Sequence, residues 1–154
     1  MADTGEISGI ISSVLLIIYV FISAAEDIKC REISLKLSVI FTISGIILGF
    51  MGKRELLSLI TALLPGAVIL LMSMLTGGAI GVGDAIFAAT CAVYLEAGEL
   101  VLCVACAWIM CALTALVMIA GTLITARSAV KHRGLPFAAY MLPPVLMTVL
   151  YKMM

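Results

Sequence analysis

Residues 77–84 read Gly-Gly-Ala-Ile-Gly-Val-Gly-Asp and separate two long apolar runs. Glycine has no side chain, so this stretch lets the backbone turn and lets another chain approach closely. Asp84 ends the stretch at the edge of an apolar run, where a carboxylate is poorly solvated and commonly marks a functional site. One acid is weak evidence by itself, and a second acid at the same level would strengthen it.

The apolar runs decide the class of protein. The chain has 154 residues, of which 64% are hydrophobic and 12% charged, and its mean hydropathy is +1.30. A soluble domain of this size would expose too much apolar surface. The formal net charge is +0, so overall charge points to no nucleic-acid partner. We therefore predict an all-α integral membrane protein whose surface contacts membrane lipid.

The lengths of the apolar runs predict how many helices there are. About 20 apolar residues cross a bilayer as a helix, because each residue rises about 1.5 Å through a core about 30 Å thick. The sequence predicts a polytopic bundle of six transmembrane helices, in one membrane-embedded domain over residues 1–154. The predicted spans are residues 7–25, 35–51, 56–75, 84–97, 100–126 and 136–151. The fourth is short and is expected to be tilted or shallow.

Lysine and arginine predict the orientation of these spans. Six basic residues lie in the loops after the first and fifth spans, and three lie on the opposite side. Loops rich in lysine and arginine remain in the cytoplasm. The N-terminus is therefore predicted outside the plasma membrane, and the loop that ends in Asp84 is predicted in the cytoplasm.

Asp27 is the second acid at that level. It ends the first predicted span on the side where Asp84 begins the fourth, and a compact bundle would allow the two to meet. Two carboxyl groups and a water can hydrolyse a peptide bond. One carboxylate takes a proton from the water, and the other, kept protonated, polarises the scissile carbonyl. Two like charges a few ångströms apart do not both ionise easily, so the pair shares a proton.

Each acid also has a simpler interpretation. Asp84 could be a helix N-cap, because aspartate is favoured there and suits the helix dipole. Asp27 could be an interfacial residue paired with Lys29 or Arg31. Glu26 is a rival for Asp27, although adjacent helical positions face different directions.

Other catalytic systems find less support in the sequence. His132 is the single histidine and lies in a basic loop. Cys103 and Cys106 have a CxxC spacing, but no second pair or suitably placed histidine completes a zinc site. We expect neither a metal nor an organic cofactor. Gly45 and Gly49 form a GxxxG pattern that favours helix packing within the bundle, and the oligomeric state stays open.

Three segments of the chain carry a resemblance to a known family. Residues 27–34, Asp-Ile-Lys-Cys-Arg-Glu-Ile-Ser, resemble a motif with an aspartate followed by a basic stretch. Residues 81–84, Gly-Val-Gly-Asp, match a GxGD motif, and residues 135–140, Leu-Pro-Phe-Ala-Ala-Tyr, resemble a Pro-Phe segment that opens a last helix. Together they resemble the type IV prepilin peptidases, which are membrane aspartyl proteases. The resemblance covers essentially the whole chain.

The resemblance implies a function and a set of site residues. The substrate would be a prepilin or pilin-like precursor, whose short basic leader is cut at the cytoplasmic membrane face. The catalytic pair would be Asp27 and Asp84. The residues implied at the motifs and along the approach of the substrate are Gly81, Gly83, Arg31, Ile33, Pro136 and Phe137.

The chain departs from the family pattern at a few positions. Ile86 stands where many members have lysine, and Ser34 and Leu35 stand where many have proline and asparagine. Only seven residues separate Asp27 from the predicted second span, so we expect the cytoplasmic region of larger members to be missing. We therefore predict a peptidase without N-methyltransferase activity. Two alternatives stay open: an archaellin-type preprotein peptidase, and a transporter or secretion subunit that uses the two acids as a proton relay.

Overall fold

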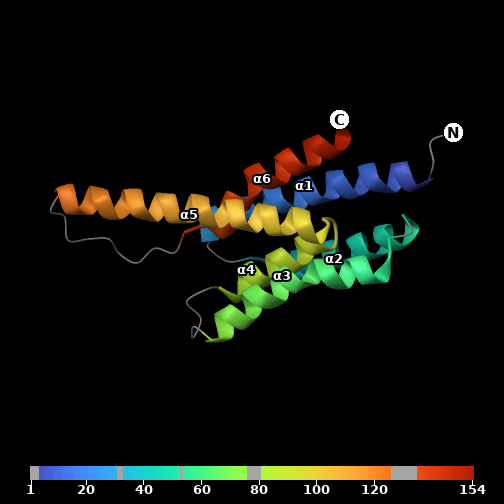
Figure 1. The fold of residues 1–154 in the computed structure, drawn as a ribbon, viewed down its shortest axis with the longest axis horizontal. Helices are drawn as coiled ribbons and strands as arrows, with labels where there is room; N and C mark the ends of the chain where they lie inside the picture. The colour runs from blue at the N-terminus through green and yellow to red at the C-terminus, as the bar shows by residue number, and fades with distance from the viewer. Residues whose placement is uncertain (1–3, 31–32, 53, 76–80, 126–134) are drawn as a thin grey trace.

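The computed structural model describes residues 4–30, 33–52, 54–75, 81–125 and 135–154. Over these residues the chain folds into six helices and contains no strand (Figure 1). The helices are α1 (Thr4–Cys30), α2 (Leu35–Met51), α3 (Leu56–Leu75), α4 (Val82–Ala92), α5 (Ala97–Thr125) and α6 (Phe137–Met153). The predicted all-α architecture is confirmed.

The bounds of α2 and α3 agree with the predicted spans, whereas α1 and α4 differ. Helix α1 continues to Cys30, so Asp27 lies inside its last turns and not at its end. Lys29 stands in the last turn, where a positive charge interacts favourably with the helix dipole. Helix α4 begins at Val82 and ends at Ala92, earlier than the predicted fourth span at both ends.

Helix α4 is a central helix. It has 11 residues and is therefore about 16 Å long, too short to cross a bilayer core as a helix. More than half of its residues are buried, namely Ala85, Phe87, Ala88, Thr90, Cys91 and Ala92. By contrast, α1, α3 and α5 contain apolar stretches that are long enough to span a membrane. The fourth predicted span is thus a short core helix enclosed by longer neighbours.

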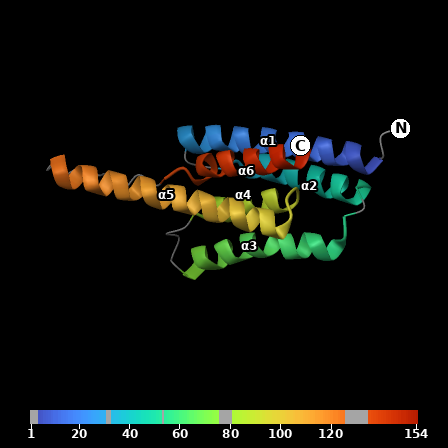
Figure 2. The same ribbon diagram turned by 45° about the horizontal axis from the view of Figure 1, so that its top comes forward.

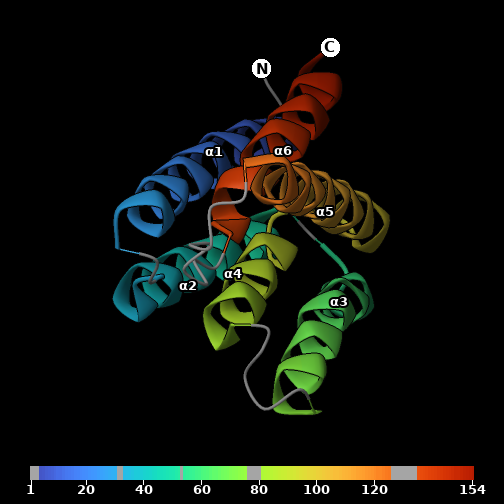
Figure 3. The same cartoon turned by 90° about the vertical axis from the view of Figure 1, so that its left-hand side faces the viewer.

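The helices alternate in direction along the chain. Each end of the bundle therefore contains the starts of some helices and the ends of others. The start of α6 meets the end of α1, and both chain termini lie at the opposite end of the molecule (Figure 1). Helix α1 packs along α6, α3 packs along α4, and α5 packs along α6 (Figures 2 and 3). We call the end that holds Asp27 and Asp84 the acid end, and the other the far end.

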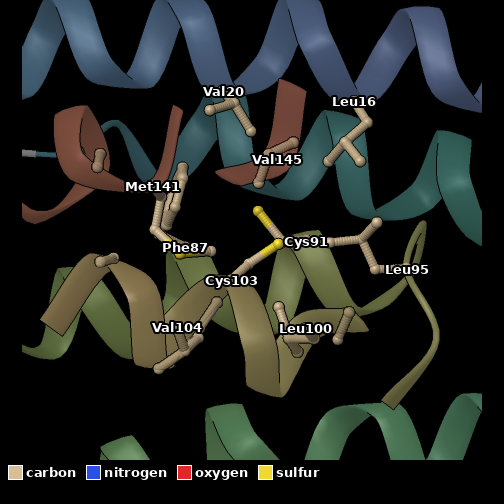
Figure 4. Packing of buried hydrophobic residues seen from close by; sticks show 14 of the residues in the cluster. Leu16, Val20, Phe87, Cys91, Leu95, Leu100, Cys103, Val104, Met141 and Val145 are labelled. Carbon is tan, nitrogen blue, oxygen red and sulfur yellow. The ribbon is translucent and has the colours of Figure 1, made fainter. Parts of the chain in front are cut away.

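A single apolar core joins these helices. Its members come from α1, α3, α4, α5 and α6, and Figure 4 shows Phe87 and Cys91 of α4 among residues of the helices around it. Gly66 lets α3 approach α4 closely, since a Cβ atom there would lie 3.1 Å from the backbone nitrogen and Cα of Ala89. Small residues at such crossings are typical of helix packing in membranes.

Hydroxyl groups add polar contacts between the helices. The Tyr19 hydroxyl of α1 lies 3.0 Å from Ser38 Oγ of α2. Thr42 of α2 donates to Thr90 of α4 at 3.1 Å. In an apolar environment these bonds satisfy groups that would otherwise be buried without a partner. They tie α4 and α1 to α2 directly beneath the acid end.

Candidate active site

Asp27 is buried against the first turn of α6. Its side chain is 7% exposed, and its Oδ2 atom accepts a hydrogen bond of 2.8 Å from the backbone N–H of Ala138. The first N–H groups of a helix have no partner within the helix, and the helix N-terminus carries a partial positive charge. The start of α6 is therefore a donor site for the Asp27 carboxylate.

The Pro-Phe segment places that N–H group. Pro136 is the N-cap of α6 and has an extended backbone, with φ −73° and ψ 94°. Phe137 is buried and meets Phe87 of α4 edge-on, with ring centroids 6.4 Å apart. Phe137 thus anchors α6 to α4 from within the core, and any effect on a substrate would be indirect. Sequence reasoning selected Pro136 and Phe137 but missed Ala138, which the helix start following Pro136 could have indicated.

Asp84 lies in the first turn of α4. Gly81 is the N-cap of that helix, and no side chain makes a capping hydrogen bond there. The N-cap interpretation of Asp84 is therefore wrong. The Asp84 carboxylate lies back over the N-cap, because a Cβ atom added to Gly81 would be 3.5 Å from Asp84 Oδ2.

The fold brings the two acids together at the acid end. Asp27 and Asp84 are close enough that their charges act on each other. Both charges also act on Cys111 of α5. Helices α1, α4, α5 and α6 therefore converge on one site, to which the first two contribute carboxyl groups and α6 contributes a backbone donor.

Gly81 and Gly83 are not required by backbone conformation. Gly81 has a φ of −65°, and Gly83 also lies outside the left-handed region. A Cβ atom on Gly83 would make only ordinary contact with Ile33, at 3.6 Å. Gly77 and Gly78, the other glycines of the predicted turn, lie outside the described residues. Because Gly81 and Gly83 have no side chains, the backbone beside Asp84 is left uncovered.

Ile33 and Arg31 are the other predicted residues of the first motif, and Glu26 is the rival acid. Ile33 precedes α2 and lies over Gly83. Arg31 lies outside the described residues. Glu26, the rival acid, accepts a hydrogen bond of 3.4 Å from the backbone N–H of Ser34, so it links the end of α1 to the start of α2.

A model of the type IV leader peptidase family matches residues 14–119, which is more than half of the chain. The chain belongs to the type IV leader peptidase family. The predicted resemblance is confirmed, and both acids lie inside the matched residues. No curated protein sequence and no solved structure matches this chain.

The family match covers one part of the site and leaves another part out. The matched residues include α2, α3 and α4 in full, but they end before α6 begins. Ala138, which donates to Asp27, is therefore outside the matched part. The donor to this acid is provided by tertiary structure from a segment that the family model does not reach.

Proposed function

We propose that this leader peptidase family member is an aspartic-type endopeptidase with Asp27 and Asp84 as its catalytic pair. Its substrates are type IV prepilins or prepilin-like precursors, from which it removes the short basic leader. The observation that carries the proposal is that the two carboxyl groups lie at one end of the bundle, close enough for their charges to interact, and that Asp27 accepts a bond from the Ala138 N–H.

The two acids take different roles in this proposal. A carboxylate accepts hydrogen bonds but cannot donate them, so the Ala138 N–H suits Asp27 as the ionised partner. Asp27 takes a proton from water while the water oxygen attacks the scissile carbonyl carbon. Asp84 holds the proton that the pair shares and gives it to the carbonyl oxygen.

Breakdown of the resulting diol completes hydrolysis. Asp27 returns its proton to the leaving amide nitrogen as the carbon–nitrogen bond breaks. Asp84 regains a proton from one hydroxyl of the diol, which becomes the new carboxyl group. Both acids end in their starting states, and the balance requires no metal or organic cofactor.

We also propose a location and an extent for this activity. The basic residues of the loops after the first and fifth predicted spans support an acid end at the cytoplasmic face of the plasma membrane. In this orientation the chain crosses the membrane several times and its N-terminus lies outside. The short connection between α1 and α2, from Cys30 to Leu35, supports a peptidase domain without N-methyltransferase activity.

Cleavage of a purified prepilin in liposomes tests the proposal, with the mass of the product as readout. Asp27→Asn and Asp84→Asn should each abolish cleavage, because an amide can neither take nor hold the transferred proton. Glu26→Gln is the matched control: it changes the neighbouring carboxylate, keeps an acceptor for Ser34, and should cleave like the wild type.

Three results would contradict parts of this proposal. Cleavage at the wild-type rate by either aspartate variant would discard the two-acid site. Cleavage of archaellin precursors but not prepilins would redirect the substrate class. Absence of cleavage of any precursor by folded protein would favour the proton relay.

A further inference from the structure

Ser23 is a buried hydroxyl that the structure leaves without a hydrogen bond. It lies one helical turn before Asp27 on α1 and is 0% exposed. Among the residues that the structure describes, its Oγ is the buried side-chain polar atom with no partner. Buried polar groups are nearly always bonded, and a missing bond in an apolar environment is costly. Ser23 therefore needs a partner that another state of the protein provides.

Helix geometry directs Asp27 toward this hydroxyl. Residues four apart lie on the same helix face, and both Ser23 and Asp27 are buried. Side chains in a helix lean toward its N-terminus, over the residue four positions earlier. The Asp27 carboxylate thus leans toward Ser23, while the Ala138 N–H bonds its Oδ2 from the side of α6.

The other hydroxyl groups around Ser23 bond to one another or to the backbone. The Tyr19 hydroxyl interacts with those of Ser23, Ser38 and Thr90, but the geometry between Tyr19 and Ser23 does not meet that of a hydrogen bond. Ser38 donates its hydrogen to the backbone oxygen of Ser34 at 3.2 Å. The Tyr19 and Ser38 hydroxyl groups lie 3.0 Å apart, and either can donate to the other.

The hydroxyl groups on the side of α4 are also hydrogen-bonded. Thr90 donates to the backbone oxygen of Ile86 at 3.0 Å, and Thr42 donates to Thr90. Ser23 Oγ has no hydrogen-bond partner within reach in the structure. Along its own helix face, the carboxylate of Asp27, four residues on, is a strong acceptor.

We infer that Ser23 is a positioning residue for Asp27, an inference that rests on the function proposed above. By rotation about its Cα–Cβ bond, Ser23 donates its hydrogen to the carboxylate when the substrate is bound. Ser23 and the Ala138 N–H then hold the carboxylate from two sides, so that it faces the attacking water. Ser23 itself contacts neither the water nor the scissile bond.

Ser23→Ala tests this inference through two readouts. The kcat for prepilin cleavage should fall on the order of 10- to 100-fold, the size expected for losing a hydrogen bond to a charged group, while KM stays unchanged. The melting temperature should stay the same or rise, because the hydroxyl has no protein hydrogen bond to lose. A serine with a merely structural role would not give this combination.

Two further variants complete the experiment. Ser23→Cys keeps a weak donor of similar size, so its kcat should lie between those of the alanine variant and the wild type. Ser73→Ala is the matched control, because Ser73 is a buried serine on α3, which contributes no acid to the site. Its kcat should equal that of the wild type.

The possible failures can be told apart. A wild-type kcat in Ser23→Ala, within an enzyme that does cleave prepilin, overturns the inference and leaves the proposed function standing. A lower melting temperature in Ser23→Ala also overturns it, because the hydroxyl would then be bonded within the folded protein. If the wild type cleaves no precursor, the proposed function fails and the inference falls with it.

Discussion

Gly45 is a residue whose small size the core requires. It is buried on α2, and a Cβ atom there would lie 2.8 Å from both Tyr94 Cζ and Val93 Cγ1. Tyr94 has little freedom to move aside, because its hydroxyl donates to the backbone oxygen of Phe41. Gly49, the other glycine of the GxxxG pattern, has nothing nearer than the Arg54 side chain at 3.9 Å.

Gly45→Ala should therefore destabilise the protein by about 1–3 kcal/mol, the usual cost of overpacking a well-filled core. Gly49→Ala is the control and should leave stability nearly unchanged. Thermal unfolding in detergent measures both. Equal effects of the two substitutions would show that the pattern acts as a unit, for example at a contact between two copies of the chain.

At the scale of elements, the short helix α4 depends on a side chain from another part of the chain. Its last carbonyl groups have no partner within the helix. Arg54, in the connection between α2 and α3, donates through Nη1 to the Val93 oxygen and through Nη2 to the Leu95 oxygen. A cation at this end also interacts favourably with the helix dipole.

Arg54→Met should cost about 1.5–3 kcal/mol of stability, because it removes charge-assisted bonds and leaves two carbonyl groups unpaired. Lys152→Met is the control at the same end of the bundle. It breaks the 2.7 Å ion pair with Glu99, in which both side chains are partly exposed, so its cost should be about 0–1 kcal/mol. Thermal unfolding compares the two, and an equal loss would contradict the role assigned to Arg54.

The far end also holds a cavity of about 610 Å³, lined by residues of α1, α2 and α6 and by the connection after α4. Arg54 and Lys152 both line it, but each already has a protein partner. Both cationic side chains of this cavity are therefore paired within the protein, and no ligand is needed to explain their presence.

At the scale of the whole molecule, the proposed orientation puts the acid end and the far end on opposite sides of the membrane. Cys30 ends α1 at the acid end and is exposed, whereas Cys91 and Cys103 are buried in the core. A thiol that faces water reacts with maleimides, and one enclosed in a core does not. Cys30 therefore reports which side the acid end faces.

A membrane-impermeant maleimide should label Cys30 in inside-out vesicles and leave it unlabelled in right-side-out vesicles. Cys30→Ser is the control for any reaction of the other cysteines. Labelling from the outside would reverse the proposed orientation and place the two acids away from the cytoplasm.

The sequence by itself was sufficient for the class of protein, the six helices and the bounds of α2 and α3, and it selected Asp27 and Asp84 as candidates. These features depend on local properties. A run of apolar residues has the length that a bilayer requires, and a charge at its edge is unusual wherever the chain folds. Asp27 and Asp84 could therefore be selected as candidates before their positions in the fold were known.

Only the tertiary structure decided how those parts meet. It made α4 a short core helix, gave Asp27 a donor from Ala138 and showed that Gly45 is packed where Gly49 is open. It also left Ser23 buried beside Asp27 without a bond. Each of these features depends on groups from helices far apart in the chain. The local pattern of apolar residues does not determine which helix faces will contact each other.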